Sequence, residues 1–110
     1  MNSPSMSSTT TRIRVCHVDD VAAGSTLKFE HGELILAIFN VAGEFYATDD
    51  ACTHGPGSLS EGELYDAVIE CNFHGGQFNV RTGAVVGPPC TVPIKTYNVT
   101  VEDGQVFVVV

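Results

Sequence analysis

The sequence predicts a single all-β domain in which short antiparallel strands build a sandwich or barrel. Its 110 residues suffice for one domain. Valine is abundant and glycine occurs 11 times, a balance that favours strands over helices. Short apolar or alternating segments follow one another along the chain with turn residues between them, the pattern of an all-β sandwich or barrel.

The first eleven residues are rich in serine and threonine and precede the first alternating segment. They have neither the basic region nor the apolar region of a secretory signal. We expect residues 1–11 to form a disordered tail, residues 12–110 to form the domain, and the protein to stay in the cytoplasm. No apolar run approaches the roughly 18 residues of a membrane-spanning helix, so no membrane partner is expected.

The first half of the domain is predicted to be a series of hairpins. Residues 12–18 alternate polar and apolar side chains, as a half-buried strand does. Residues 19–24 form a turn, with one helical turn capped by an aspartate. Residues 33–40 are apolar enough for a central strand. The flanking strands are expected at 25–29 and 45–48, with turns at His31-Gly32 and 41–44.

The composition changes after residue 48, where a Gly/Pro/Ser-rich stretch runs to Gly62. Gly87-Pro88-Pro89 cannot continue a strand ladder and is predicted to be a loop. The loops at about 48–87 look like an insertion between the strands of a larger base. The strands expected in this half are 67–70, 77–80, 84–86, 95–101 and 105–110.

Two short clusters within the insertion carry the chemistry. Cys52-Thr53-His54 and Cys71-Asn72-Phe73-His74 each offer one thiolate and one imidazole, and 16 residues separate them. Each cluster is followed at once by glycine, which permits a tight turn or a close approach to a bound group. Two such pairs predict a metal site.

The spacing bears on the identity of the metal. Structural zinc accepts two Cys and two His, but its usual motifs pair Cys with Cys and His with His. Here each loop provides one of each, which suits a binuclear centre, while a structural zinc module stays as the alternative. A zinc protein would be colourless, whereas an iron–sulfur protein is brown.

The pattern Cys-x-His, spacer, Cys-x-x-His resembles that of the Rieske 2Fe–2S proteins, over nearly all of residues 12–110. The resemblance implies a Rieske fold, with an antiparallel β-sandwich base and a small cluster-binding subdomain. It also implies one 2Fe–2S cluster, with Cys52 and Cys71 on one iron and His54 and His74 on the other.

Differences from the Rieske proteins of respiratory chains indicate which branch of the family this chain resembles. Those members carry an additional cysteine in each loop, joined as a disulfide, where this chain has Gly57 and Phe73. They also carry two hydroxyl side chains that donate to the cluster sulfurs, where this chain has Gly76 and Phe78. The chain is therefore most similar to the Rieske ferredoxins of bacterial aromatic-ring dioxygenase systems.

That resemblance implies that the chain is a one-electron carrier and catalyses no substrate reaction by itself. The expected partners are a flavoprotein ferredoxin reductase and a terminal oxygenase with Rieske and mononuclear iron centres, and a monomer is expected. The sequence shows no serine triad, no GxGxxG after a strand and no mononuclear iron triad. A Rieske-type small subunit of another oxidoreductase, such as nitrite reductase, is the second reading.

The net charge and the remaining cysteine, histidine and aspartate residues allow further predictions. The net charge of −8 argues against a nucleic-acid partner and suits a basic protein partner. Cys16 is expected in the core, and Cys90 is expected to be a free thiol near the cluster. His17 and His31 are expected at the surface. Asp49 and Asp50 are interpreted as turn residues of an acidic face.

Overall fold

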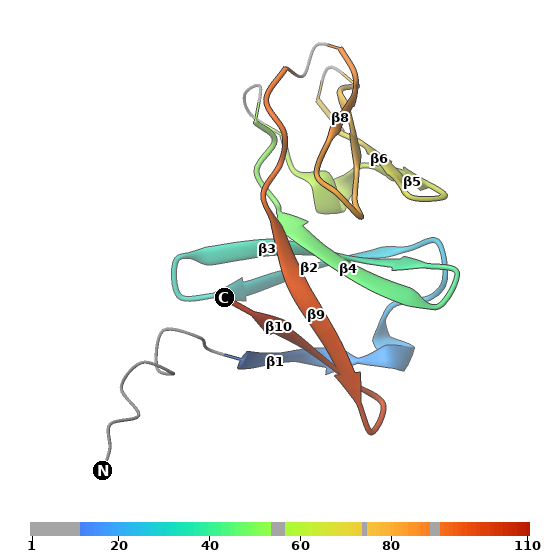
Figure 1. The fold of residues 1–110 in the computed structure, drawn as a ribbon, viewed down its shortest axis with the longest axis vertical. Helices are drawn as coiled ribbons and strands as arrows, with labels where there is room; N and C mark the ends of the chain where they lie inside the picture. Colours follow the sequence, from blue (N-terminus) through green and yellow to red (C-terminus); the bar gives the residue numbers. More distant parts are fainter. Residues whose placement is uncertain (1–11, 54–56, 74, 89–90) are drawn as a thin grey trace.

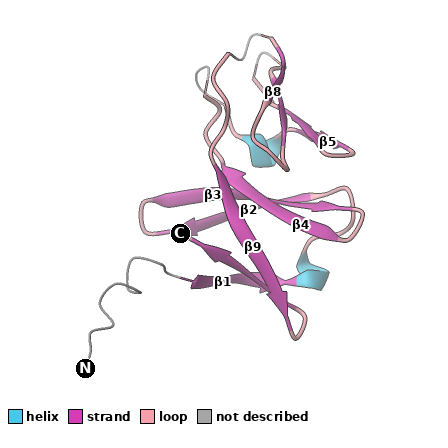
Figure 2. Cartoon of the chain, in the orientation of Figure 1, coloured by secondary structure: helices cyan, strands magenta, loops and turns pink. Residues whose placement is uncertain are grey.

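The computed structural model describes residues 12–53, 57–73, 75–88 and 91–110. Most of these residues lie in strands, as expected (Figure 2). The strands are β1 (Arg12–His17), β2 (Thr26–His31), β3 (Leu34–Val41), β4 (Glu44–Asp49), β5 (Glu63–Tyr65), β6 (Val68–Glu70), β7 (Gln77–Asn79), β8 (Val85–Gly87), β9 (Thr96–Glu102) and β10 (Gln105–Val109). Two single turns of 3-10 helix join them within the described residues, η2 (Val18–Asp20) and η3 (Leu59–Glu61).

The strands form two antiparallel sheets. Six of them make a base in the order β1-β10-β9-β4-β3-β2, and the other four make a smaller sheet in the order β5-β6-β7-β8. The base bends sharply where β4 meets β9, because only Ala47 with Tyr97 and Thr48 with Thr96 are paired there. Its two halves thus face each other as a sandwich, and the smaller sheet lies above it (Figure 1).

Strand β3 is the centre of the packing because both of its faces are buried. Leu36 and Ile38 face the interior of the sandwich, where they pack with Val108 of β10. The alternate residues Ala37 and Phe39 face the smaller sheet. Successive side chains of a strand point to opposite faces, so one strand supports two cores. The apolar run at 33–40 predicts this central position correctly.

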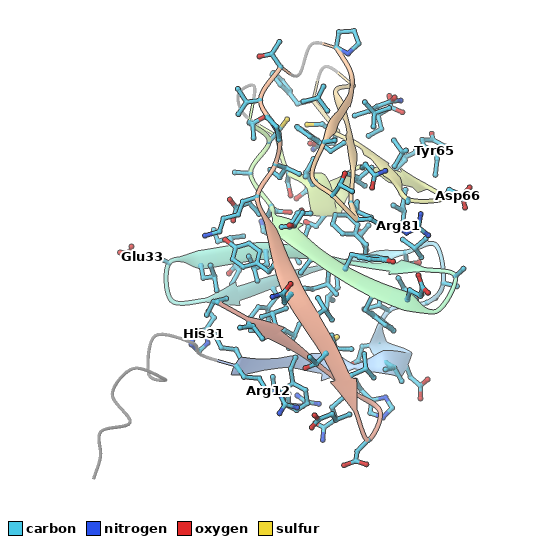
Figure 3. All side chains as sticks on the ribbon, viewed as in Figure 1. Arg12, His31, Glu33, Tyr65, Asp66 and Arg81 are labelled. Atoms are coloured by element: carbon cyan, nitrogen blue, oxygen red, sulfur yellow. The ribbon has the colours of Figure 1, made fainter. Side chains whose placement is uncertain are left out.

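The segment between the paired strands β4 and β9 carries the smaller sheet and the predicted metal motifs. Its core consists of Leu59, Ala67, Ile69, Phe78, Val80 and Ile94, which pack with Cys52, Cys71 and the upper face of β3. Arg81 adds a polar link to the base, since its Nε donates to Tyr46 Oη of β4 at 3.1 Å (Figure 3).

Several local predictions need correction. The capping residue of the helical turn η2 is His17 and not an aspartate: its Nδ1 accepts from the Asp19 N–H, while Asp20 Oδ2 accepts from the His17 N–H. Strand β5 and the turn η3 were not predicted, because η3 lies within the Gly/Pro/Ser-rich stretch interpreted as loop and β5 directly follows that stretch. Gly87 was predicted to be in a loop, yet it pairs with Gln77 at the end of β8. His31 lies at the end of β2 and not in a turn, although it is exposed as expected.

The predicted tail falls entirely on residues outside the described ranges. Within the described part of the chain, no helix is long or apolar enough to cross a bilayer.

Candidate metal centre

Two of the four predicted ligands are described, and the structure brings them together. Cys52 follows β4 and Cys71 follows β6, so one comes from the base and the other from the smaller sheet. Both are buried, at 6% and 3% exposure. His54 and His74 lie outside the described residues. No group of three metal-binding side chains occurs among the described residues alone.

The two cysteines sit at the start of loops with the same closure. The N–H of Cys52 donates to Gly57 O at 3.2 Å, and the N–H of Cys71 donates to Gly76 O at 2.7 Å. Each cysteine therefore closes a loop onto the glycine five residues later. In the sequence, His54 and His74 each fall between the two residues that close their loop.

Gly57 marks the place where the two loops meet. A Cβ built on Gly57 would lie 2.6 Å from Cys71 Sγ and 3.4 Å from Cys52 Cβ. The same Cβ would lie 3.2 Å from Phe73 Cβ, in the second loop. Its φ of +153° is also one that residues with a side chain rarely adopt. Glycine is thus required here, because any side chain would occupy the space beside the thiols.

Burial changes the acidity of the second thiol. Loss of solvent chiefly, with smaller contributions from the Cys52 side chain and the charge of Asp50, raises the pKa of Cys71 to about 11. The Phe73 N–H, 3.4 Å from Cys71 Sγ, acts in the opposite direction because it stabilises the thiolate. Without metal this thiol stays protonated at neutral pH, so metal binding must release its proton.

A third loop lies against the first. Thr53 Oγ1 donates to Val92 O at 2.7 Å, which attaches the segment after Pro88 to the cluster-side loop. This contact places the segment that follows the Gly87-Pro88-Pro89 stretch against the first cysteine loop. Pro89 and Cys90 fall outside the described residues, so the predictions about them stay open.

Polar residues that sequence reasoning missed surround the thiols. The prediction that Asp50 belongs to an acidic surface is wrong, because its side chain is only 4% exposed. Its carboxylate accepts from Ser58 Oγ at 2.6 Å and from the Ser60 N–H at 2.8 Å. Asp49 is not a turn residue either, since it ends β4 and accepts from Tyr97 Oη at 2.5 Å. Nothing in the one-dimensional pattern separates these acids from solvated ones.

The remaining described cysteine is confirmed as a core residue. Cys16 is buried at 4% exposure, and burial raises the pKa of its thiol. It packs with Val21 and Val106 at the far end of the base and is a free thiol. The described cysteines thus separate into one core residue and one convergent pair.

The described donors fit the thiolate side of an iron–sulfur cluster. Two buried sulfurs from different loops converge on a surface kept open by glycine, and a backbone N–H already points at one of them. Thiolates are soft ligands that suit iron–sulfur clusters and zinc. Together, the all-β base and the raised loop site define a small metal-binding type of domain.

Comparison with known proteins identifies the family. The model of the Rieske [2Fe-2S] domain matches residues 11–98. The chain is 47% identical to ferredoxin CarAc of Metapseudomonas resinovorans, over 87% of this chain and 91% of that protein. It is 49% identical to the biphenyl dioxygenase ferredoxin subunit of Pseudomonas sp. strain KKS102, over 86% and 88% of the two chains.

Solved structures agree with the sequence comparison. The fold is similar to a chain in the complex of reduced oxygenase and oxidized ferredoxin in carbazole 1,9a-dioxygenase, with a TM-score of 0.85, 47% identity, and 88% and 91% coverage. It is also similar to the Sphingomonas yanoikuyae B1 ferredoxin, with a TM-score of 0.85, 43% identity, and 89% and 97% coverage. The chain belongs to the Rieske [2Fe-2S] family. It is an electron carrier with one Rieske-type 2Fe–2S cluster.

Proposed function

We propose that Cys52 and Cys71 ligate one iron of the cluster and that His54 and His74 ligate the other. The convergence of the two buried thiols around Gly57 carries this proposal. The matching closure of the two loops supports it further, because each loop would present its own histidine in the same way. Each imidazole would bind through one nitrogen and leave the other for a proton or a partner.

We propose further that the chain accepts an electron from a flavoprotein reductase and delivers it to a terminal oxygenase. Support comes from relatives described as ferredoxin components of dioxygenase systems, and from the similar chain found in a complex of oxygenase and ferredoxin. The bound cluster supplies a one-electron couple. The protein provides a binding site that is shielded from water and lies close to the protein surface. The chain would transform no substrate, and we place its work in the cytoplasm, where thiols stay reduced.

The surroundings of Cys71 suit such a binding site. Cys71 is buried, whereas Phe73, two residues later, is 41% exposed, so the thiol is shielded from water yet lies close to the surface along the chain. The Phe73 N–H gives one fixed donor to the sulfur, and a fixed dipole needs little rearrangement when charge changes. The binding site thus combines low solvent access with a short path for an electron to a partner protein.

Iron and labile sulfide analysis tests the ligand set. The isolated protein should contain two irons and two sulfides per chain, and Cys52→Ser or His74→Ala should lose them. Cys16→Ser is the matched control, because that thiol lies in the lower core and should leave the iron content unchanged. Unchanged iron in Cys52→Ser would remove Cys52 from the ligand set.

Reconstitution tests the carrier role. NADH oxidation by a flavoprotein reductase, coupled to product formation by a terminal oxygenase, should depend on the concentration of this chain and stop with Cys52→Ser. Product formation at an equal rate without the chain would contradict the proposal.

A further inference from the structure

The two cysteine loops are joined through Ser58. No disulfide can tie them at Gly57 and Phe73. Instead, the Ser58 N–H in the first loop region donates to Asn72 Oδ1 at 2.9 Å, and Asn72 directly follows Cys71. Asn72 Nδ2 in turn donates to Glu61 Oε1 at 3.3 Å, at the end of η3. The second loop is therefore attached by a side-chain amide to the segment that follows the first loop.

The other side of Ser58 is attached to Asp50. Ser58 Oγ donates to Asp50 Oδ2 at 2.6 Å and lies 3.0 Å from Ser60 Oγ, while Asp50 Oδ1 accepts from the Ser60 N–H. Both carboxylate oxygens thus have a donor. The backbone of Asp50 is fixed as well, because its N–H donates to Ile35 O of β3 and its carbonyl accepts from the Leu59 N–H.

We propose that Asp50, Ser58 and Asn72 form a polar clamp that positions the loops of Cys52 and Cys71 for the cluster, and that the buried charge of Asp50 lowers the reduction potential. The inference rests on the proposed ligand set. All three residues are positioning residues, since they act on the site through the loops and through the field. Below, "the clamp" means these three residues.

The hydrogen-bond geometry indicates that these residues position the loops and are not merely solvated polar side chains. Hydrogen bonds of 2.6–3.1 Å connect β3 to Asp50, Asp50 to Ser58 and Ser58 to Asn72, and Asn72 directly follows Cys71 in the chain. Charged acceptors make shorter and stronger hydrogen bonds than neutral ones, so Asp50 fixes Ser58 more firmly than an amide would. Removal of Asn72 would leave the Ser58 N–H without this acceptor, at a cost that destabilises the joined loops.

The charge of Asp50 has an effect that its hydrogen bonds do not. The only cation near its carboxylate among the described residues is Lys28 Nζ, at 4.0 Å, and that side chain is 41% exposed. A buried carboxylate two residues from Cys52 therefore opposes an added electron, which makes the reduced state less favourable. Asparagine has nearly the same shape and keeps an oxygen for the Ser60 N–H, but it has no charge.

The experiment separates these two effects in the intact, cluster-loaded protein. Loss of visible absorbance in excess iron chelator measures cluster retention, and a spectroelectrochemical titration measures the midpoint potential. The clamp variants are Asn72→Ala, Asp50→Ala and Asp50→Asn. The matched controls are Asn98→Ala on β9 of the base and Asp103→Asn in the β9–β10 turn; this turn lies at the opposite end of β9 from the loops (Figure 1).

We expect Asn72→Ala and Asp50→Ala to lose iron several-fold faster than wild type and Asn98→Ala. Asp50→Asn should retain iron better than Asp50→Ala, because it keeps the acceptor for the Ser60 N–H, and its potential should be higher than that of wild type, while Asp103→Asn leaves the potential unchanged. A purely structural role for Asp50 would not move the potential of the well-folded asparagine variant. Since Asn72 is exposed, its alanine variant should fold even if Asp50→Ala does not.

Two results would overturn the proposal. Equal rates of iron loss in Asn72→Ala and Asn98→Ala would exclude the clamp. Equal potentials in Asp50→Asn and Asp103→Asn would exclude the role of the charge. The ligand set is judged separately: if Cys52→Ser loses its iron while the clamp variants behave like the controls, only the clamp fails. If Cys52→Ser keeps the full cluster, the ligand assignment fails first.

Discussion

Single residues decide how closely the two cysteine loops approach. Gly57 touches both loops, and its position leaves no volume for a side chain. Phe78 fills the core beneath the thiols and has no hydroxyl to offer them. Two predictions follow from these two positions.

Gly57→Ala should lower cluster occupancy and stability. The new Cβ would lie 2.6 Å from Cys71 Sγ, in addition to the backbone strain at φ +153°, and we expect a loss of about 2 kcal/mol or more. Gly32→Ala is the control, because its φ is +63° but nothing lies within 4 Å of its Cβ. It should cost about 1 kcal/mol and keep its iron. Equal iron content in the two variants would contradict the steric argument.

The reduction potential should lie near the low end of the Rieske range, roughly −150 mV. Two imidazoles in place of two thiolates raise it above all-cysteine ferredoxins, but Gly76 and Phe78 provide no hydroxyl donors to the sulfurs. Phe78→Tyr should raise the potential if its hydroxyl reaches a sulfur. Phe29→Tyr in the lower core serves as control. A wild-type midpoint above zero at neutral pH would refute this prediction.

At the scale of elements, β3 and the β4–β9 junction hold the cluster segment on the base. Strand β3 gives one face to each core. The junction joins the two halves of the base directly below the inserted segment. The consequences of mutation should therefore depend on which face or end of these elements is changed.

Alanine substitution on the two faces of β3 should separate global stability from cluster retention. Phe39→Ala and Leu36→Ala should each cost about 3 kcal/mol, because both side chains are fully buried. Only Phe39 packs in the core that contains Cys52 and Cys71. Chelator assays below the unfolding transition should show faster iron loss for Phe39→Ala than for Leu36→Ala. The reverse order would show that the two cores are not independent.

Ionisation of Tyr97 at the β4–β9 junction should lower the free energy of unfolding at high pH. Burial and the hydrogen bond to Asp49 raise the pKa of Tyr97 to about 12. The neutral phenol is favoured in the folded state, so this stabilisation is complete below pH 10 and is lost as the pH rises from 10 to 12. Urea titrations at pH 8 and pH 11 should show a decline about 1 kcal/mol larger for wild type than for Tyr97→Phe. Parallel declines would exclude Tyr97 as the cause.

At the scale of the whole molecule, the cluster-bearing segment carries half of the net negative charge. Residues 50–94 contain five acidic residues and one basic residue, Arg81. Tyr65 and Asp66 mark the exposed end of the β5–β6 hairpin, on the flank of this segment (Figure 3). The segment that carries the predicted ligands is therefore acidic, with Asp66 at an exposed hairpin on its flank.

Electron transfer to a basic partner should slow as ionic strength rises. Asp66→Asn should reduce the rate about two-fold at low salt and reduce its salt dependence; asparagine tolerates the φ of +59° at this position. Glu33→Gln, in the β2–β3 turn of the base, removes the same charge away from the cluster and should have little effect. Stopped-flow rates that stay flat from low to high salt would reduce the surface charge to a role in solubility.

The sequence by itself determined the class of fold and the class of site. Alternation and turn residues located nine of the ten described strands, because these patterns reflect local geometry and burial. The Cys-x-His and Cys-x-x-His pairs determined the chemistry, because ligand type and spacing are properties of the chain. The apolar run at 33–40 also placed β3 at the centre of the fold.

Only the tertiary structure decided which polar residues support the site. Asp49 and Asp50 are adjacent in sequence and equally acidic, yet one accepts from Tyr97 across the β4–β9 junction and the other is buried beneath the loops. Ser58 and Asn72 are short polar residues in loops, and their contact spans 14 positions of the chain. Such pairings depend on how the smaller sheet sits on β3, since hydrogen bonds and burial are set by neighbours in space and not by neighbours in sequence.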